Sequence, residues 1–166
     1  MVSATIHIAL GSNRAHARHG APSAVVRAAI AAIADAGLQV VAQSAIRGTP
    51  PLGPRQRRFA NAVIAVTTDL TPQAVLALLQ GIEAAFGRQR GRRWGPRVLD
   101  LDLIAAGATV VRVRGLSVPH VELAHRDFVL APLVEIDGGW RHPLLHLTAR
   151  QLRARLLRPK RTNEGP

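Results

Sequence analysis

Two aspartates, Asp100 and Asp102, lie in the apolar run VLDLDLI of residues 98–104. Side chains two positions apart in a strand point to the same face, so the spacing predicts neighbouring carboxylates, with the leucines on the other face in the core. Two like charges side by side repel each other unless a positive group lies between them. Magnesium, which prefers oxygen ligands, or guanidinium groups would meet that need. We therefore interpret the pair as a candidate magnesium site that handles a polyphosphate.

An arginine-rich segment directly precedes the two aspartates. Its five arginines and three glycines within residues 87–97 suit a mobile lid that holds an anion. The alternative is a solvated basic loop, from which Arg93 or Arg97 forms salt bridges with aspartates on an exposed strand face. The arginines of the segment are Arg88, Arg90, Arg92, Arg93 and Arg97.

The composition indicates a folded domain and excludes several kinds of site. The chain has 166 residues, of which 48% are hydrophobic, enough for a sizeable core. It contains no cysteine, so disulfides and thiolate metal sites are excluded, and its seven histidines show no zinc-like spacing. Because it has neither an apolar run of about 18 residues nor a signal-like N-terminus, we expect a cytoplasmic protein without a membrane partner.

The formal net charge of +12 leaves other functions open. A positive field attracts any polyanion, so a nucleic-acid-binding module is one alternative. Aromatic residues, which stack on the bases of single strands, make up only 3% of the chain, and an Asp-x-Asp strand has no use in such a module. A two-metal nuclease or phosphodiesterase is another alternative, because paired aspartates serve that chemistry as well. We expect small-molecule substrates and no nucleic acid.

Hydrophobic periodicity and capping signals predict the elements that position these residues. Pro22 suits the first turn of a helix and Gly37 its end, and Thr71 suits the cap of a second helix. Thr148 and Gln151 form a capping box. The expected strands are residues 2–10, 38–47, 59–68, 97–106 and, after a turn at residues 107–108, 109–113; the expected helices are residues 22–36, 72–86, 126–135 and 149–157.

The order of these elements, β-α-β-β-α-β, is that of the split βαβ fold. We therefore predict an α+β protein with a ferredoxin-like βαββαβ core, an extra hairpin strand and C-terminal helices, in which helices flank an antiparallel-rich sheet. Residues 1–158 are expected to form a single domain, and residues 159–166 a disordered basic tail.

The sequence contains neither a G-x-x-x-x-G-K-[ST] loop nor a G-x-G-x-x-G motif. Instead, segments along nearly the whole chain resemble the 6-hydroxymethyl-7,8-dihydropterin pyrophosphokinases. The most specific is RWGPRVLDLD; the full set is residues 93–102 (RWGPRVLDLD), 9–13 (ALGSN), 49–54 (TPPLGP), 59–62 (FANA), 118–120 (VPH) and 126–128 (RDF). The resemblance implies transfer of pyrophosphate from ATP to the hydroxymethyl group of the pterin, with release of AMP, in tetrahydrofolate biosynthesis.

The resemblance also implies a role for individual residues in a magnesium-dependent enzyme, which we expect to be a monomer. Asp100 and Asp102 would hold two magnesium ions, and Arg88 and Arg97 would act with them in catalysis. The residues expected to contact ATP are Glu83, Arg88, Arg90, Arg97, Leu103, His120 and Arg126. The residues expected to contact the pterin are Thr49, Pro50, Leu52, Phe59, Asn61, Trp94 and Phe128.

Taken singly, several of these residues have simpler interpretations. Phe59 and Phe128 would be ordinary core residues, Asn61 would hydrogen-bond at a strand end, and His120 would be structural or exposed.

Two positions depart from the family pattern. Arg47 and Val121 stand where the family commonly has aromatic residues. These departures concern local packing and nucleotide affinity more than the chemistry.

Overall fold

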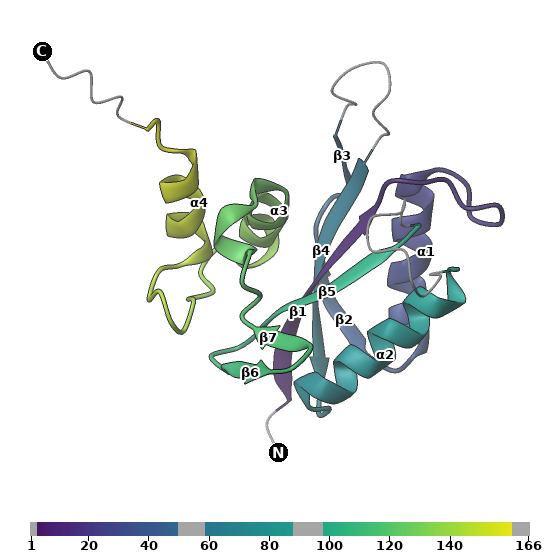
Figure 1. The fold of residues 1–166 in the computed structure, drawn as a ribbon, viewed down its shortest axis with the longest axis horizontal. Coiled ribbons are helices and arrows are strands. Elements are labelled where there is room, and N and C mark those ends of the chain that lie inside the picture. The colour runs from purple at the N-terminus through teal and green to yellow at the C-terminus, as the bar shows by residue number, and fades with distance from the viewer. Residues whose placement is uncertain (1–2, 50–58, 88–97, 161–166) are drawn as a thin grey trace, which may run out of the picture.

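The computed structural model describes residues 3–49, 59–87 and 98–160. Its centre is a sheet in the order β2-β4-β1-β5, with the short strand β3 paired to one end of β4 (Figure 1). All pairings in this sheet are antiparallel. Since β4 lies between β1 and β2, the predicted ferredoxin-like arrangement is confirmed. The strands are β1 (Ala4–Ser12), β2 (Gln39–Gln43), β3 (Arg47–Thr49), β4 (Phe59–Thr68) and β5 (Asp100–Ala106).

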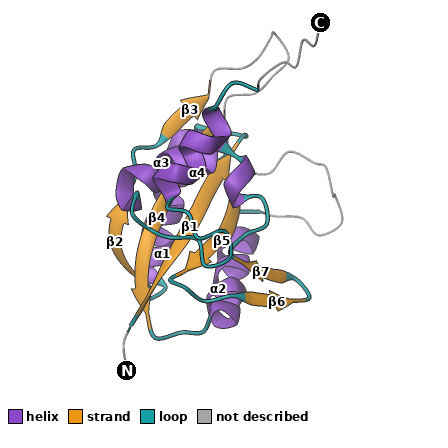
Figure 2. Cartoon of the chain, turned by 90° about the vertical axis from the view of Figure 1, so that its left-hand side faces the viewer, coloured by secondary structure: helices purple, strands orange, loops and turns teal. Residues whose placement is uncertain are grey.

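Helices cover both faces of the sheet. Helices α1 (Pro22–Asp35) and α2 (Pro72–Ala85) lie on one face, and α3 (Asp127–Asp137) and α4 (Ala149–Leu157) lie on the other (Figures 1 and 2). None of the helices within the described residues is long and apolar enough to cross a membrane.

Local sequence signals explain where the helices begin and end. The side chain of Thr71 accepts a hydrogen bond from Ala74 N at 3.2 Å, and the predicted capping box of α4 is present with both of its hydrogen bonds. Gly37, with a φ of 97°, follows the end of α1 in the left-handed conformation that glycine adopts without strain. The helix boundaries therefore agree with the prediction to within two residues.

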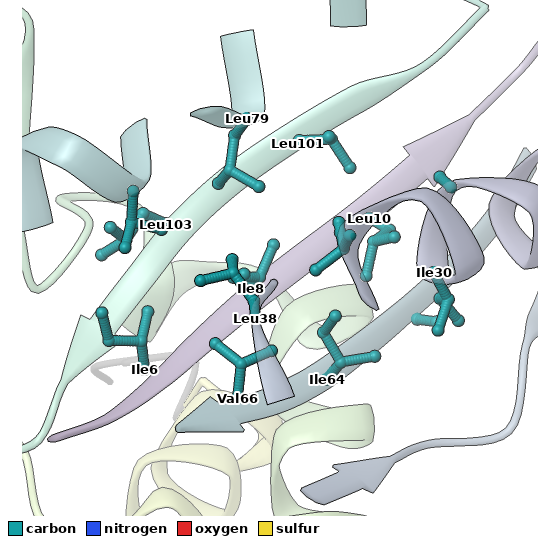
Figure 3. Packing of buried hydrophobic residues seen from close by; sticks show 14 of the residues in the cluster. Ile6, Ile8, Leu10, Ile30, Leu38, Ile64, Val66, Leu79, Leu101 and Leu103 are labelled. Carbon is teal, nitrogen blue, oxygen red and sulfur yellow. The ribbon is translucent and has the colours of Figure 1, made fainter. Parts of the chain in front are cut away.

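Strand alternation divides the apolar residues into two cores. The first lies between the sheet and the helices α1 and α2, and it includes Ile8, Leu79, Leu101 and Leu103 (Figure 3). The second lies under α3 and α4 and is formed by residues such as Val63, Ile104, Leu130, Leu133 and Leu152. Each face of the central strands is thus fixed by its own core, so a shift of one residue in register would expose both sets.

Two of the expected strands are wrong in part. Residues 38–47 form two strands, β2 and β3, because residues 44–46 leave the regular pairing with β4. The expected strand at residues 109–113 does not form a hairpin with β5. Instead, β6 (Val111–Val113) pairs with β7 (Leu116–Val118) in a separate two-stranded sheet, with Gly115 at a φ of 82° in the turn. Most of the tail expected to be disordered lies outside the described residues.

Candidate active site

One row of residues crosses the sheet near the end where β5 begins. The backbone register pairs Gly11 of β1 with Asp100 on one side and with Asn61 of β4 on the other. Asn61 is paired in turn with Arg47 of β3. Asp100 and Asn61 lie two strands apart, a separation of about 10 Å between backbones. The row therefore places a carboxylate and an amide on the same face of the sheet, one on each side of Gly11.

The second aspartate lies one pleat further along the same face. Asp102 is paired with Ala9, and both aspartates are half-buried while the leucines that alternate with them are buried. Leu101 and Leu103 pack in the core under α1 and α2. The two carboxylates therefore lie on the opposite face of β5, as the period of two predicts. In this chain the carboxylates share the face that α3 and α4 cover further along the sheet.

The side chain of Asn61 lies close to Gly11 of strand β1. A Cβ atom at Gly11 would lie only 3.2 Å from Asn61 Oδ1, a tighter contact than most Cβ atoms make. The absence of a side chain at Gly11 therefore leaves room for the amide above the row. No role was predicted for Gly11 itself, although it lies in the motif ALGSN at residues 9–13.

Phe59 and Phe128 are not core residues. Their exposed fractions are 43% and 50%, so the interpretation as ordinary core packing is wrong for both rings. The guanidinium carbon of Arg126 lies 5.7 Å from the centroid of the Phe128 ring, a cation–π distance. Arg126 directly precedes α3, and its Nε lies 4.0 Å from Glu122 Oε2. Both rings are accessible to a planar ligand.

His120 is held by one hydrogen bond of its backbone and one of its imidazole ring. Its backbone N–H donates to the carbonyl of Ile104, directly beyond the aspartates on β5, at 2.9 Å. Its Nδ1 accepts a hydrogen bond from Glu122 N at 3.1 Å. Because Nδ1 is an acceptor, the ring proton is carried by Nε2, which is left as a donor. Such a donor suits a phosphate oxygen.

Two of the predicted ATP contacts are buried. Glu83 is 2% exposed, so it lies on the inner face of α2. Leu103 is 3% exposed in the first core, so any contact that it makes with a nucleotide must involve its main chain.

The structure does not describe all of the predicted site. The main chain of Thr49 is described and is paired with Phe59. The remaining predicted positions, and with them the possible salt bridges of Arg93 and Arg97 to the aspartates, lie outside the described residues: Pro50, Leu52, Arg88, Arg90, Arg92, Arg93, Trp94 and Arg97.

In the described part of the chain, the two aspartates are the candidates for binding a metal ion. No group of three or more histidine, cysteine, aspartate or glutamate residues able to hold a metal ion occurs there. Magnesium is usually bound by one or two carboxylates together with substrate phosphates and water, so a pair of half-buried carboxylates fits it. A structural zinc site, which needs four protein ligands, does not fit this set.

Comparisons with known proteins show relatives of this chain. The family model for 7,8-dihydro-6-hydroxymethylpterin-pyrophosphokinase matches residues 7–138. The 2-amino-4-hydroxy-6-hydroxymethyldihydropteridine pyrophosphokinase of Methylorubrum extorquens is 43% identical over 132 residues, which are 78% of this chain and 80% of that protein. The protein of the same name from Pseudomonas aeruginosa is 40% identical over 140 residues, 83% of each chain.

A solved structure supports the fold. The HPPK-DHPS of Plasmodium falciparum in complex with pteroate matches with a TM-score of 0.70 over 93% of this chain, at 13% identity. The match spans 42% of that longer chain.

Proposed function

Because the chain belongs to the 7,8-dihydro-6-hydroxymethylpterin-pyrophosphokinase family, we propose that it transfers pyrophosphate from ATP to the hydroxymethyl group of 6-hydroxymethyl-7,8-dihydropterin. The products are AMP and the pyrophosphorylated pterin, and the reaction serves tetrahydrofolate biosynthesis. The single observation that carries this proposal is the row formed by Asp100, Gly11 and Asn61. It offers a carboxylate and an amide on the two sides of Gly11, a residue that has no side chain of its own.

The pterin is assigned to the Asn61 end of this row. An amide both donates and accepts hydrogen bonds, so Asn61 can match the amide-like edge of the ring. The exposed rings of Phe59 and Phe128 are available to stack against its faces. The other residues that we assign to the pterin are Thr49, Pro50, Leu52 and Trp94.

The metal is assigned to Asp100 and Asp102, which would hold two magnesium ions. Bound there, magnesium would neutralise charge on the transferred phosphoryl groups, the main requirement of such a transfer. The two carboxylates fix this position because both lie on β5, a strand with a buried core on its other face.

The triphosphate is assigned to the positively charged and donor groups around the aspartates. His120 offers Nε2 as a donor, since its Nδ1 is occupied by Glu122 N. Arg126 offers a guanidinium, whose planar set of donors fits phosphate oxygens. We further assign Arg88, Arg90 and Arg97 to the phosphates, Arg88 and Arg97 to catalysis, and Glu83 and the main chain of Leu103 to the nucleotide.

Product analysis of the purified protein tests this proposal. With ATP, magnesium and the reduced pterin, we expect AMP and the pyrophosphorylated pterin in equal amounts, and no AMP when the pterin is left out. Absence of pterin-dependent AMP would refute the proposal. Release of free phosphate without an acceptor would instead support a nuclease-like or phosphodiesterase-like hydrolase. We further expect the enzyme to act in the cytoplasm and to elute as a monomer in size-exclusion chromatography.

A further inference from the structure

The carboxylate of Glu135, on α3, binds the segment that joins β2 to β3. Oε1 accepts a hydrogen bond from the backbone N–H of Ala45 at 2.9 Å, and Oε2 accepts one from Arg47 Nη2 at 3.1 Å. Both hydrogen bonds lower the pKa of Glu135, the bond from Ala45 more than the bond from Arg47. This side chain is therefore anionic at neutral pH. Both oxygens of one carboxylate are thus used to hold a single short segment.

This segment needs a partner because it leaves the sheet. Ser44 is still bonded to Val63, once through its backbone and once through its side chain: Ser44 N donates to Val63 O at 2.9 Å, and Val63 N donates to Ser44 Oγ at 3.0 Å. The next residue, Ala45, therefore directs its N–H away from β4 and toward α3. Glu135 supplies the acceptor that the strand no longer provides.

Strand β3 begins directly after this contact and adjoins the row of the site. Arg47 is the first residue of β3 and is paired with Asn61, and Thr49 is paired with Phe59. Among the described residues, β4 is the only strand that pairs with β3, and a three-residue strand at a sheet edge has few bonds of its own to fix its position. Glu135 therefore contributes to the position of β3 and, through it, to that of the adjoining part of β4.

The contact with Glu135 also fixes the position of the Arg47 guanidinium, a positive charge next to Asn61. Arg47 and Asn61 are cross-strand neighbours, whose side chains lie on one face of the sheet about 5 Å apart at their Cβ atoms. The ion pair with Glu135 draws the Arg47 guanidinium toward α3 and neutralises it. Without Glu135, this long cation would be free to turn over Asn61 and compete for its amide oxygen.

We propose that Glu135 is a positioning residue for the pterin end of the site, acting through Ala45 and Arg47 on β3 and Asn61. The inference rests on the proposed pyrophosphokinase function. It concerns the pterin and not ATP, because the contacts of Glu135 lie on the β3 side of the row, whereas Asp100 and Asp102 lie on the β5 side.

Steady-state kinetics of Glu135→Ala and Glu135→Gln test the proposal. In Glu135→Ala we expect the KM for the pterin to rise at least about fivefold, while the KM for ATP stays within about twofold, since a small displacement of a binding group weakens only the ligand it contacts. Glu135→Gln keeps an acceptor for Ala45 N but loses the attraction to Arg47, so a smaller rise is expected. An unchanged KM for the pterin in the alanine variant, or in the glutamine variant should the alanine variant not fold, overturns the proposal.

Arg153→Gln is the matched control. Arg153 Nε lies 2.9 Å from Oδ1 of Asp127, which like Glu135 is on α3. The two ion pairs have similar side-chain exposures: 36% and 45% for Arg153 and Asp127, and 48% and 36% for Arg47 and Glu135. This control should keep the wild-type KM for both substrates. A rise in the KM for the pterin equal to that of Glu135→Ala would show a general loosening of α3 and would overturn the proposal. Wild-type protein without pterin-dependent AMP would instead refute the proposed function.

Discussion

Asn61 lies so close to Gly11 that a methyl group added to the glycine would come within 3.2 Å of the amide oxygen of the asparagine. The two residues are cross-strand partners at the centre of the row that leads to Asp100. The contact explains why a glycine is needed inside a strand, where glycine is otherwise unfavourable. It also makes Gly11 a sensitive position for ligand binding.

The substitution Gly11→Ala should displace the Asn61 amide. Since the neighbour must move by a few tenths of an ångström, we expect the KM for the pterin to rise about three- to tenfold, with a much smaller change in the KM for ATP. Gly81→Ala is the control: a Cβ there meets nothing within 4 Å, and the helix should become more stable by about 0.5–1 kcal/mol without a change in either KM. Equal kinetics of the two variants would contradict the role of Gly11.

His120 should bind ATP through Nε2, because Nδ1 already accepts from Glu122 N. His120→Asn can keep the acceptor near Nδ1, whereas His120→Gln can place an amide donor near Nε2. We expect the KM for ATP to rise about tenfold in the asparagine variant, the scale of one lost charge-assisted hydrogen bond, and less in the glutamine variant. The reverse order, measured in the same steady-state assay, would show that the local bond to Glu122 matters more than the distal donor.

His7 should make the stability of the protein depend on pH. It is 1% exposed, and its Nε2 lies 3.0 Å from Asp137 Oδ2, but neither ring nitrogen makes a well-directed hydrogen bond to a residue that the structure describes. Burial lowers the pKa of His7, an effect that Asp137 partly opposes. The unfolded chain therefore binds a proton more readily than the folded chain. The free energy of unfolding should fall as the pH drops through 6.5, the ordinary pKa of histidine, and should level off below the lower pKa of His7 in the folded protein.

Two variants check the origin of this dependence by urea unfolding at several pH values. His7→Gln should flatten the slope, although His142, whose pKa is also lowered by burial, leaves part of it. Asp137→Asn removes the charge that raises the pKa of His7, so its slope should be steeper than that of the wild type. A slope unchanged by both substitutions would contradict the assignment to His7.

The sequence was most informative where a regular period met a strong core. The alternation of residues 98–104 placed both aspartates on one face, and β4 was predicted with the bounds that the structure has, Phe59–Thr68. Caps at Thr71 and Thr148 located two helices because their hydrogen bonds are local.

The sequence was least informative where a contact joins distant residues or very short strands. Ala45, in the break between β2 and β3, donates its backbone N–H to Glu135, 90 positions later, and no local pattern predicts that contact. The same contact gives a structural role to Arg47, which stands where the family commonly has an aromatic residue: its guanidinium pairs with a carboxylate of α3. Strands β6 and β7 have three residues each, too few for a period of two to be recognised, so the partner of β6 was assigned wrongly.

The proposed reaction depends above all on the two neighbouring carboxylates of β5, Asp100 and Asp102. Pterin-dependent AMP formation by Asp100→Asn and Asp102→Asn, each compared with the wild type over a magnesium titration, tests it most directly. We predict that each variant keeps the wild-type melting temperature to within a few degrees but loses turnover by about 100-fold or more, the scale of a single group that stabilises charge in a transition state. Wild-type turnover in either variant at the same magnesium concentration would contradict the account.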